Sequence, residues 1–186
     1  VGDGAGYRIT TGADNTVIGN MEDSGVGAMT SSSNTFVGRS AGESNTSGAS
    51  NTFIGSLCGD LATTGATNTG VGGSCLTALT TAANNTAVGA SCMAANTTGT
   101  DNVAMGSGAL TANTTGAAHT AVGRSAMAAN TTGANNVGIG YRALVSNTTG
   151  ARNTSVGYDS LNGNTTASYN TVFGFEAMYT NTTGAS

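Results

Sequence analysis

The segment NTAVGASCMAANTTGTD, residues 85–101, decides the fold, because the chain repeats it from end to end. Its opening pattern, Asn-Thr-x-Val-Gly, recurs nineteen residues after its first occurrence and every seventeen residues thereafter. The ten units begin at Asn15, Asn34, Asn51, Asn68, Asn85, Asn102, His119, Asn136, Asn153 and Asn170. We number the positions of each unit from this residue. Residues 1–14 form a partial unit, residues 15–33 an irregular unit, and residues 34–186 regular units.

The unit predicts an all-β parallel solenoid. Seventeen residues cannot hold two helices, and Gly and the β-branched residues Thr and Val are poor helix formers. Thr86 and Val88 alternate as in a strand, a second apolar segment follows at Cys92 and Met93, and Asn-Thr-Thr-Gly closes a turn. We therefore expect about eleven coils with two short strands each, in a single domain. Neither end has an atypical capping unit, so we expect a segment of a longer fibre.

The columns formed by stacked coils predict which side chains face inward. The fourth position, such as Val88, and the ninth, such as Met93, are apolar in successive units and are expected to form core ladders. The third position, such as Ala87, should then face outward, with Phe36 and Phe53 covering a loop at the acidic pair Glu22-Asp23 in the irregular unit. The fifth position is always Gly, which indicates positive φ or a closely approaching backbone.

The composition excludes several classes of function. The net charge is −4, Lys is absent and the five Arg are scattered, so a nucleic-acid partner is not expected. No run approaches the ~20 apolar residues of a membrane span. The acidic residues form no calcium-binding pattern, and His119 has no neighbour in the repeat that would make it a base or ligand. We therefore expect no catalytic, metal or cofactor site.

Three cysteines share the eighth position of consecutive units, namely Cys58, Cys75 and Cys92. Two coils ~4.8 Å apart would permit a disulfide by distance, whereas parallel Cβ vectors in a ladder disfavour its geometry. Ala stands at the same position in other units, and a free Cys behaves as a small hydrophobic residue. We therefore predict buried free thiols.

The recurring asparagines allow two interpretations. The first-position column is expected to form a side-chain hydrogen-bond ladder along the rod. The Asn-Thr-Thr turn, by contrast, should lie at the outer edge, where its asparagines fit the Asn-x-Ser/Thr glycosylation pattern. Turn chemistry alone would also explain that pattern. The possible acceptors are Asn45, Asn84, Asn96, Asn113, Asn130, Asn147, Asn153, Asn164 and Asn181.

The repeat resembles the β-roll head repeats of trimeric autotransporter adhesins and related repeats of phage and environmental tail-fibre proteins. Residues 140–144 (GYRAL) and 157–161 (GYDSL) match the longer variant of that repeat most closely. The resemblance implies a left-handed parallel β-roll, a homotrimer around one axis and an extracellular location on a cell or virion. The unit is longer than that of the adhesins, and no stalk is present.

These observations predict a structural segment of an extracellular fibre, without catalysis. The expected partners are copies of the same chain, as a homotrimer or an end-to-end fibre, packed through the small third-position face and the Gly column. The alternative is an adhesin head that binds a host protein or glycan. A third reading, an ice-binding solenoid, needs a flat face with regularly spaced Thr columns, and the adjacent Thr97 and Thr98 lie in a turn instead.

Overall fold

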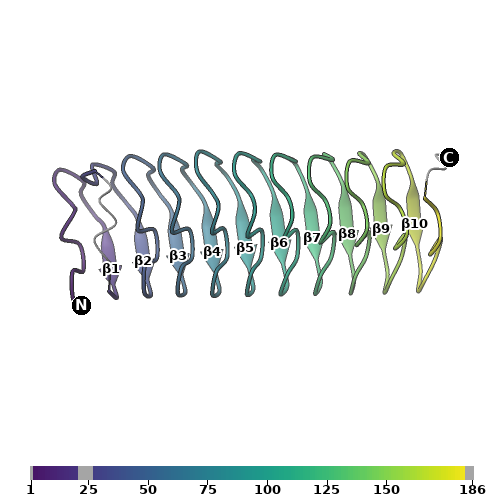
Figure 1. Ribbon diagram of the computed structural model, residues 1–186, viewed down its shortest axis with the longest axis horizontal. Helices are drawn as coiled ribbons and strands as arrows, with labels where there is room; N and C mark the ends of the chain where they lie inside the picture. The colour runs from purple at the N-terminus through teal and green to yellow at the C-terminus, as the bar shows by residue number, and fades with distance from the viewer. Residues whose placement is uncertain (1, 21–26, 183–186) are drawn as a thin grey trace.

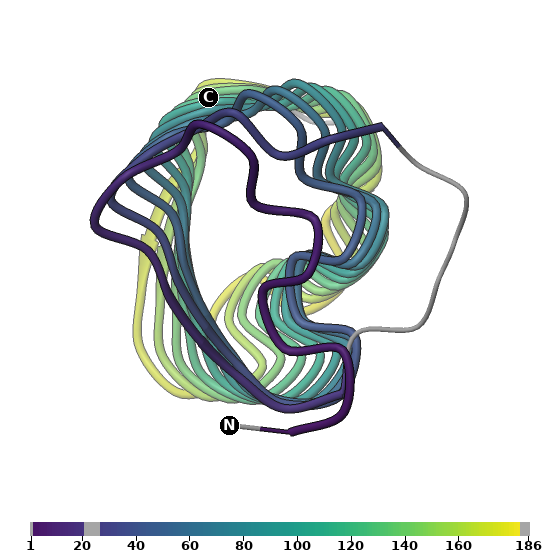
Figure 2. The same cartoon turned by 90° about the vertical axis from the view of Figure 1, so that its left-hand side faces the viewer.

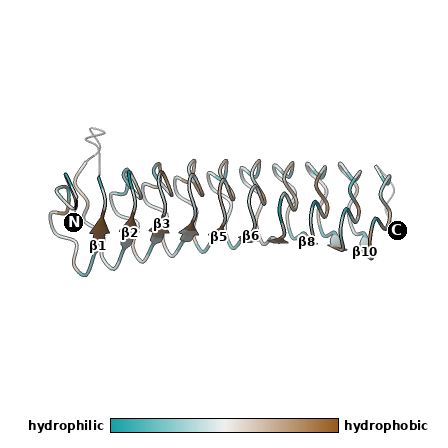
Figure 3. Cartoon of the chain, turned by 90° about the horizontal axis from the view of Figure 1, so that it is seen from below, coloured by the Kyte–Doolittle hydropathy of each residue, from teal (hydrophilic) through white to brown (hydrophobic). Residues whose placement is uncertain are grey.

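The computed structural model describes residues 2–20 and 27–182, which wind into a rod-shaped β-solenoid (Figure 1). The strands lie in one row along the rod, and the hydrophobic colour recurs on them (Figure 3). All ten form a single parallel sheet in which each strand pairs with its neighbours in the chain. The strands are β1 (Thr16–Ile18), β2 (Thr35–Val37), β3 (Thr52–Ile54), β4 (Thr69–Val71), β5 (Thr86–Val88), β6 (Val103–Met105), β7 (Thr120–Val122), β8 (Val137–Ile139), β9 (Thr154–Val156) and β10 (Thr171–Phe173).

Strand pairing follows the sequence repeat residue for residue. Thr16 lies opposite Thr35, nineteen residues later, and Thr35 lies opposite Thr52, seventeen residues later. All later pairs keep the step of seventeen. The Cα atoms of Cys58 and Cys75, one coil apart, are separated by 4.8 Å, the spacing of neighbouring strands. One sequence unit is therefore one coil, as predicted.

The direction of winding and the irregular coil can both be followed in the view along the rod. Seen from its N-terminal end, the chain turns counter-clockwise as it recedes (Figure 2), so the solenoid is left-handed. The backbone N–H of Ser40 donates to the Asn20 carbonyl, and that of Thr30 donates to the Thr46 carbonyl. The two extra residues therefore fall between Asn20 and Thr30. The pair Glu22-Asp23, which we expected in a protruding loop, lies outside the described residues.

The two faces of the strands are reversed relative to the sequence-based assignment. Ala87 and Ala104, at the third position, are fully buried, whereas Ile54 and Met105, at the fourth, are 38% and 46% exposed. The third position therefore faces the core, and the second and fourth face outward. Period-two alternation shows that adjacent residues face opposite sides, but it does not show which side is inside. The expectation of a fourth-position core ladder and an outward third position is wrong.

Phe36 and Phe53 lie in the core instead of covering a surface loop. Their rings stack with centroids 5.4 Å apart and planes 8° apart, and both side chains are buried. The ninth residue of each coil makes room for them. A Cβ atom at Gly42 would lie 2.7 Å from the Phe36 ring, and one at Gly59 would lie 2.6 Å from the Phe53 ring.

In later coils the same space is filled by the ninth residue, which lies opposite the strand, instead of by the third. Where the third residue is Ala, Gly or Ser, the ninth is a long aliphatic side chain. A Cβ at Gly138, for example, would lie 2.7 Å from Cγ of Met127. The predicted ninth-position ladder is thus confirmed, and its fully buried members are Leu76, Met93, Leu110, Met127, Leu144 and Leu161. One large side chain per coil is enough to fill the narrow cross-section at native packing density.

The second apolar segment of each coil is a series of turns rather than a second strand. In the coil that begins at Asn85, Ser91, Met93 and Asp101 have φ values of 54°, 48° and 61°. Positive φ recurs at these seventh, ninth and seventeenth positions along the rod. Left-handed residues interrupt the extended chain, so the described residues contain one strand per coil.

The glycines of the fifth-position column are required for both reasons that the sequence left open, a positive φ and a closely approaching backbone. Gly89 has φ of 135°, and a Cβ there would lie 2.6 Å from the carbonyl carbon of Gly106 in the next coil. The same contact with the following coil recurs from Gly2 to Gly157. Every coil therefore needs Gly immediately after its strand.

Candidate functional site

The first-position asparagines form the predicted ladder, buried inside the rod. Oδ1 of Asn85 accepts a hydrogen bond from the backbone N–H of Asn102, 3.1 Å away in the next coil. Nδ2 of Asn85 donates to the carbonyl of Gly99 in its own coil, at 3.0 Å. Each side chain therefore ties its own turn closed and fixes the coil that follows. The oxygen of Asn85 gives the backbone N–H of Asn102 its partner, and the Gly99 carbonyl also accepts from Nδ2 of Asn96.

The turn asparagines at the twelfth position form a second buried ladder. Nδ2 of Asn113 donates to Oδ1 of Asn96 in the preceding coil and to the carbonyl of Gly116 in its own, both at 3.0 Å. The pattern continues through Asn130, Asn147 and Asn164. In the coils that begin at Asn51 and Asn68, Ala62 and Leu79 interrupt this ladder.

The expected placement of the glycosylation acceptors at an outer edge is wrong for most of them. Their side chains turn inward because the turn leaves carbonyls that only the asparagine amides reach. Sugar attachment itself stays a prediction, and it needs an accessible amide. Asn84 is exposed, although its Nδ2 donates to Asp101 at 3.1 Å, and Asn181 is half-buried. The buried members are Asn45, Asn96, Asn113, Asn130, Asn147, Asn153 and Asn164.

His119 replaces an asparagine in the first ladder and reproduces its hydrogen bond to the next coil. Its Nδ1 accepts from the backbone N–H of Asn136 at 3.2 Å, where other coils use Oδ1. Its Nε2 lies 3.1 Å from Nδ2 of Asn130, a member of the second ladder. The side chain is 1% exposed, and burial lowers its pKa to about 4. A neutral, enclosed imidazole thus occupies the place of a ladder asparagine.

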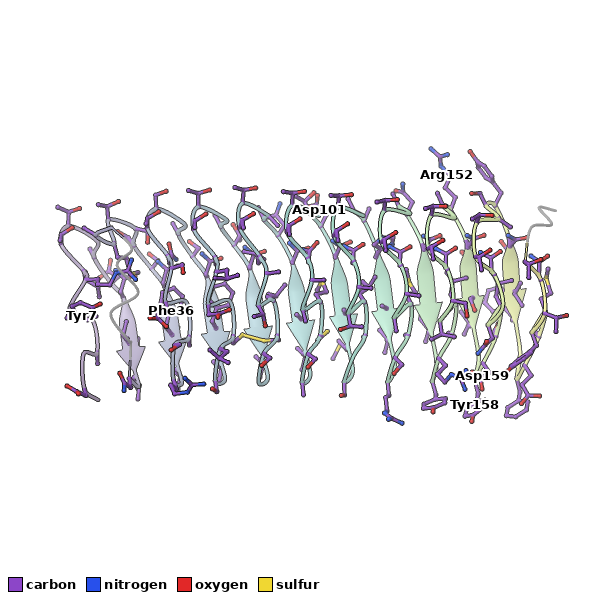
Figure 4. All side chains as sticks on the ribbon, in the orientation of Figure 1. Tyr7, Phe36, Asp101, Arg152, Tyr158 and Asp159 are labelled. Carbon is purple, nitrogen blue, oxygen red and sulfur yellow. A yellow bond between two sulfur atoms is a disulfide. The ribbon has the colours of Figure 1, made fainter. Side chains whose placement is uncertain are left out.

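The cysteine column is buried, as predicted, but two of its thiols are oxidised. A disulfide joins Cys58 to Cys75, and Cys92 is a free thiol (the disulfide is visible in Figure 4). The prediction of three free thiols is therefore wrong. The Cα separation is the expected 4.8 Å, which permits a disulfide, so the error lay in the assumption that stacked Cβ vectors disfavour the bond.

The outer face of the sheet is the most regular exposed surface and the strongest candidate for binding. Its second-position column is Thr in every strand except β6 and β8, where Val replaces it, and its fourth-position column is Val, Ile, Met or Phe. Ile18, Ile54, Met105 and Ile139 are 37–46% exposed. None of these strand positions carries a charge. This face was missed because the sequence-based assignment placed the fourth position in the core.

A second exposed feature is an aromatic column at the sixth position near the C-terminal end. Tyr141 stacks on Tyr158 with ring centroids 5.0 Å apart, and Tyr158 stacks on Phe175 at 5.1 Å. Arg124 covers the remaining face of Tyr141 at 5.8 Å. Tyr158 and Asp159 lie at the edge of the rod opposite Asp101 and Arg152 (Figure 4). The stacked rings turn their faces toward one another, so the column mainly stiffens that edge.

Of the surface that we expected between subunits, the third-position column is enclosed in the core. The third-position residues are buried in the core, and the Gly column contacts the next coil of the same chain. A copy of the chain cannot reach the third-position column, whereas the glycines of the Gly column stay partly exposed. The outer sheet face runs along the same row of strands and is open to association.

Within residues 2–20 and 27–182, no three His, Cys, Asp or Glu side chains lie close enough to hold a metal ion. The same residues include no helix of the length and hydrophobicity needed to cross a membrane. Comparisons with protein families, curated proteins and solved structures found no match.

Proposed function

We propose that the chain is a structural segment of an extracellular fibre and that it associates with copies of itself through the outer face of its sheet. The observation that carries this proposal is the outward-facing fourth-position column, in which Ile and Met are exposed and Val half-buried, beside a column of Thr. Monomeric proteins rarely expose a contiguous apolar patch of more than a few hundred Å². A copy of the same sheet would cover this surface.

The remaining features agree with a structural role. The chain repeats one building unit throughout, and hydrogen bonds between successive coils run along its length. The disulfide between Cys58 and Cys75 favours an oxidising compartment, such as the outside of a cell. A left-handed β-solenoid is also the architecture implied by the resemblance to adhesin and tail-fibre repeats. We extend that resemblance to a homotrimer with its sheets facing a common axis.

Charged substitutions on the outer face test the proposal. Replacing both Val88 and Val122 by Lys would place two cations in a contact that is otherwise uncharged, and burying them there is costly. We expect sedimentation velocity to show that this variant is monomeric at concentrations at which the unmodified chain associates.

The matched control carries the same charge away from the sheet. Thr98 and Thr132 are exposed in the Asn-Thr-Thr-Gly turns, and replacing both by Lys should leave association unchanged. Equal association of both variants would contradict the use of the sheet face. Equal dissociation would show that net charge, rather than this surface, controls assembly.

One observation favours a second candidate function, the binding of ice. The Thr residues at the second position form a column on the outer face of a regular sheet, whereas the sequence-based interpretation had judged ice binding from the turn residues Thr97 and Thr98. An uncharged array of hydroxyl and methyl groups at fixed spacing could order a layer of water. Thermal hysteresis of the unmodified chain that disappears on replacement of Thr86 and Thr120 by Tyr would favour ice binding over self-association. A lack of thermal hysteresis in the unmodified chain would exclude ice binding.

A further inference from the structure

The cysteine column offers Cys75 two neighbours in equivalent positions. Cys58 lies one coil before it and Cys92 one coil after it, and all three side chains are fully buried. The backbone register is the same on both sides. Gly59 donates to the Cys75 carbonyl at 2.9 Å, and Leu76 donates to the Cys92 carbonyl at 3.0 Å. The main chain therefore does not explain why Cys75 bonds to Cys58 and leaves Cys92 reduced.

The strand residue beneath the sulfur atoms differs between the two sides. Gly70 of β4 lies under the disulfide, and a Cβ atom there would be 2.6 Å from Sγ of Cys58 and 3.1 Å from Sγ of Cys75. The first distance is too short for any real Cβ, so the disulfide occupies the volume of a missing methyl group. In the next coil Ala87 pairs with Gly70 in register and supplies that methyl group.

We propose that Gly70 selects the Cys58–Cys75 disulfide and that Ala87 prevents the alternative Cys75–Cys92 disulfide. Gly70 leaves space for two bonded sulfur atoms between the coils that begin at Asn51 and Asn68. Ala87 fills the corresponding space one coil later. Cys92 instead directs its Sγ at the carbonyl of Ala104, 3.3 Å away. Its solitary thiol is therefore a consequence of strand composition.

The selection acts on a balanced exchange reaction. The Cys92 thiolate would attack Sγ of Cys75, forming the Cys75–Cys92 bond and releasing Cys58 as a thiolate that then takes up a proton. No oxidant is consumed in this step. The first disulfide forms from two thiols by exchange with a small-molecule disulfide such as oxidised glutathione, which takes up two electrons. Burial raises the pKa of Cys92 to about 12, which further opposes exchange in the folded chain.

The selected position has a structural consequence. Cys58 and Cys75 belong to the two coils in which Ala62 and Leu79 interrupt the second asparagine ladder. The disulfide therefore joins the pair of coils that lack this side-chain link. A Cys75–Cys92 bond would join the second of these coils to the following coil and leave the interrupted pair without either connection.

The test is refolding of the full chain in a buffer of reduced and oxidised glutathione, in which disulfides equilibrate. Free thiols are alkylated, and chymotryptic peptides are mapped by mass spectrometry, since Leu61 and Leu79 separate the three cysteines. We expect only the Cys58–Cys75 linkage in the unmodified chain. In the double variant Gly70→Ala, Ala87→Gly, the ratio of the two linkages should change by roughly tenfold or more in favour of Cys75–Cys92.

The variants can be expected to fold, because Ala and Gly both stand at the third position of other coils. Gly138→Ala is the matched control, since that residue packs on Met127, away from the cysteines. Its linkage should be that of the unmodified chain. Comparable amounts of both linkages in the unmodified chain, no linkage at all, or an unchanged Cys58–Cys75 bond in the double variant would overturn the proposal.

Discussion

Nδ1 of His119 accepts a hydrogen bond from the backbone N–H of Asn136, in the place where the other regular coils use an asparagine side-chain oxygen. The imidazole serves as an acceptor there only while Nδ1 is unprotonated. Because the pKa of the buried ring is about 4, compared with an ordinary value of 6.5, folding favours the neutral form.

The first prediction follows from that pKa. The contribution of neutral His119 to the free energy of unfolding is fully present above pH 6.5 and is lost as the pH falls toward 4. Between these values the imidazole binds a proton in the unfolded chain but stays neutral in the folded chain. The loss should reach about 3 kcal/mol, from the size of the shift. Urea unfolding at pH 7.5 and pH 4 measures it. His119→Asn should remove this part of the pH dependence, and an equal loss in that variant would contradict the assignment.

A second prediction concerns the Gly column. Gly89→Ala would force a non-Gly residue to φ of 135° and place its Cβ 2.6 Å from the carbonyl carbon of Gly106. We expect destabilisation of about 2–5 kcal/mol from strain and overpacking together. Gly73→Ala is the control, because a Cβ there meets nothing within 4 Å. Urea midpoints should separate the two variants, and similar midpoints would show that the column is not under this constraint.

A third prediction tests how the core is filled. Phe53→Ala should cost about 3–5 kcal/mol by leaving a cavity beside Gly59. Gly59→Leu should also destabilise the rod, because its side chain would collide with the Phe53 ring. Combining the two recreates the pair found at Ala104 and Leu110 and should restore much of the stability. A double-mutant cycle measures this coupling. Additive losses of stability would show that the side chains at positions 53 and 59 do not occupy the same space in the core.

The sequence predicted the features of this fold that follow from its repeat length. It missed those that depend on which face of each strand points into the core. The seventeen-residue step fixed the coil, the parallel sheet and the ninth-position ladder, because every unit repeats the same evidence. The inward face of the strand could not be predicted, since Ala87 and Val88 alternate equally well in either orientation. Only the reciprocal exchange of Phe53 with Gly59 and of Ala104 with Leu110 contains that information.

The candidate binding surfaces depended on the same question of which strand face points inward. Once the fourth position had been assigned to the core, its apolar column could not be recognised as an exposed face. The buried turn asparagines were missed for a different reason. Asn96 and Asn113 occupy a polar turn that normally faces water, and their inward orientation follows from carbonyls that become enclosed only when coils stack. The disulfide likewise depended on Gly70, which lies five residues before Cys75 in the chain.

The central claim is that chains associate through the outer face of the sheet, and the solution mass of the unmodified protein tests it most directly. Multi-angle light scattering over a range of concentrations measures that mass without assuming a shape. Self-association predicts a multiple of the 17.9 kDa chain, with three copies for the homotrimer. A mass of one chain at every concentration would contradict self-association and leave the solenoid itself unaffected.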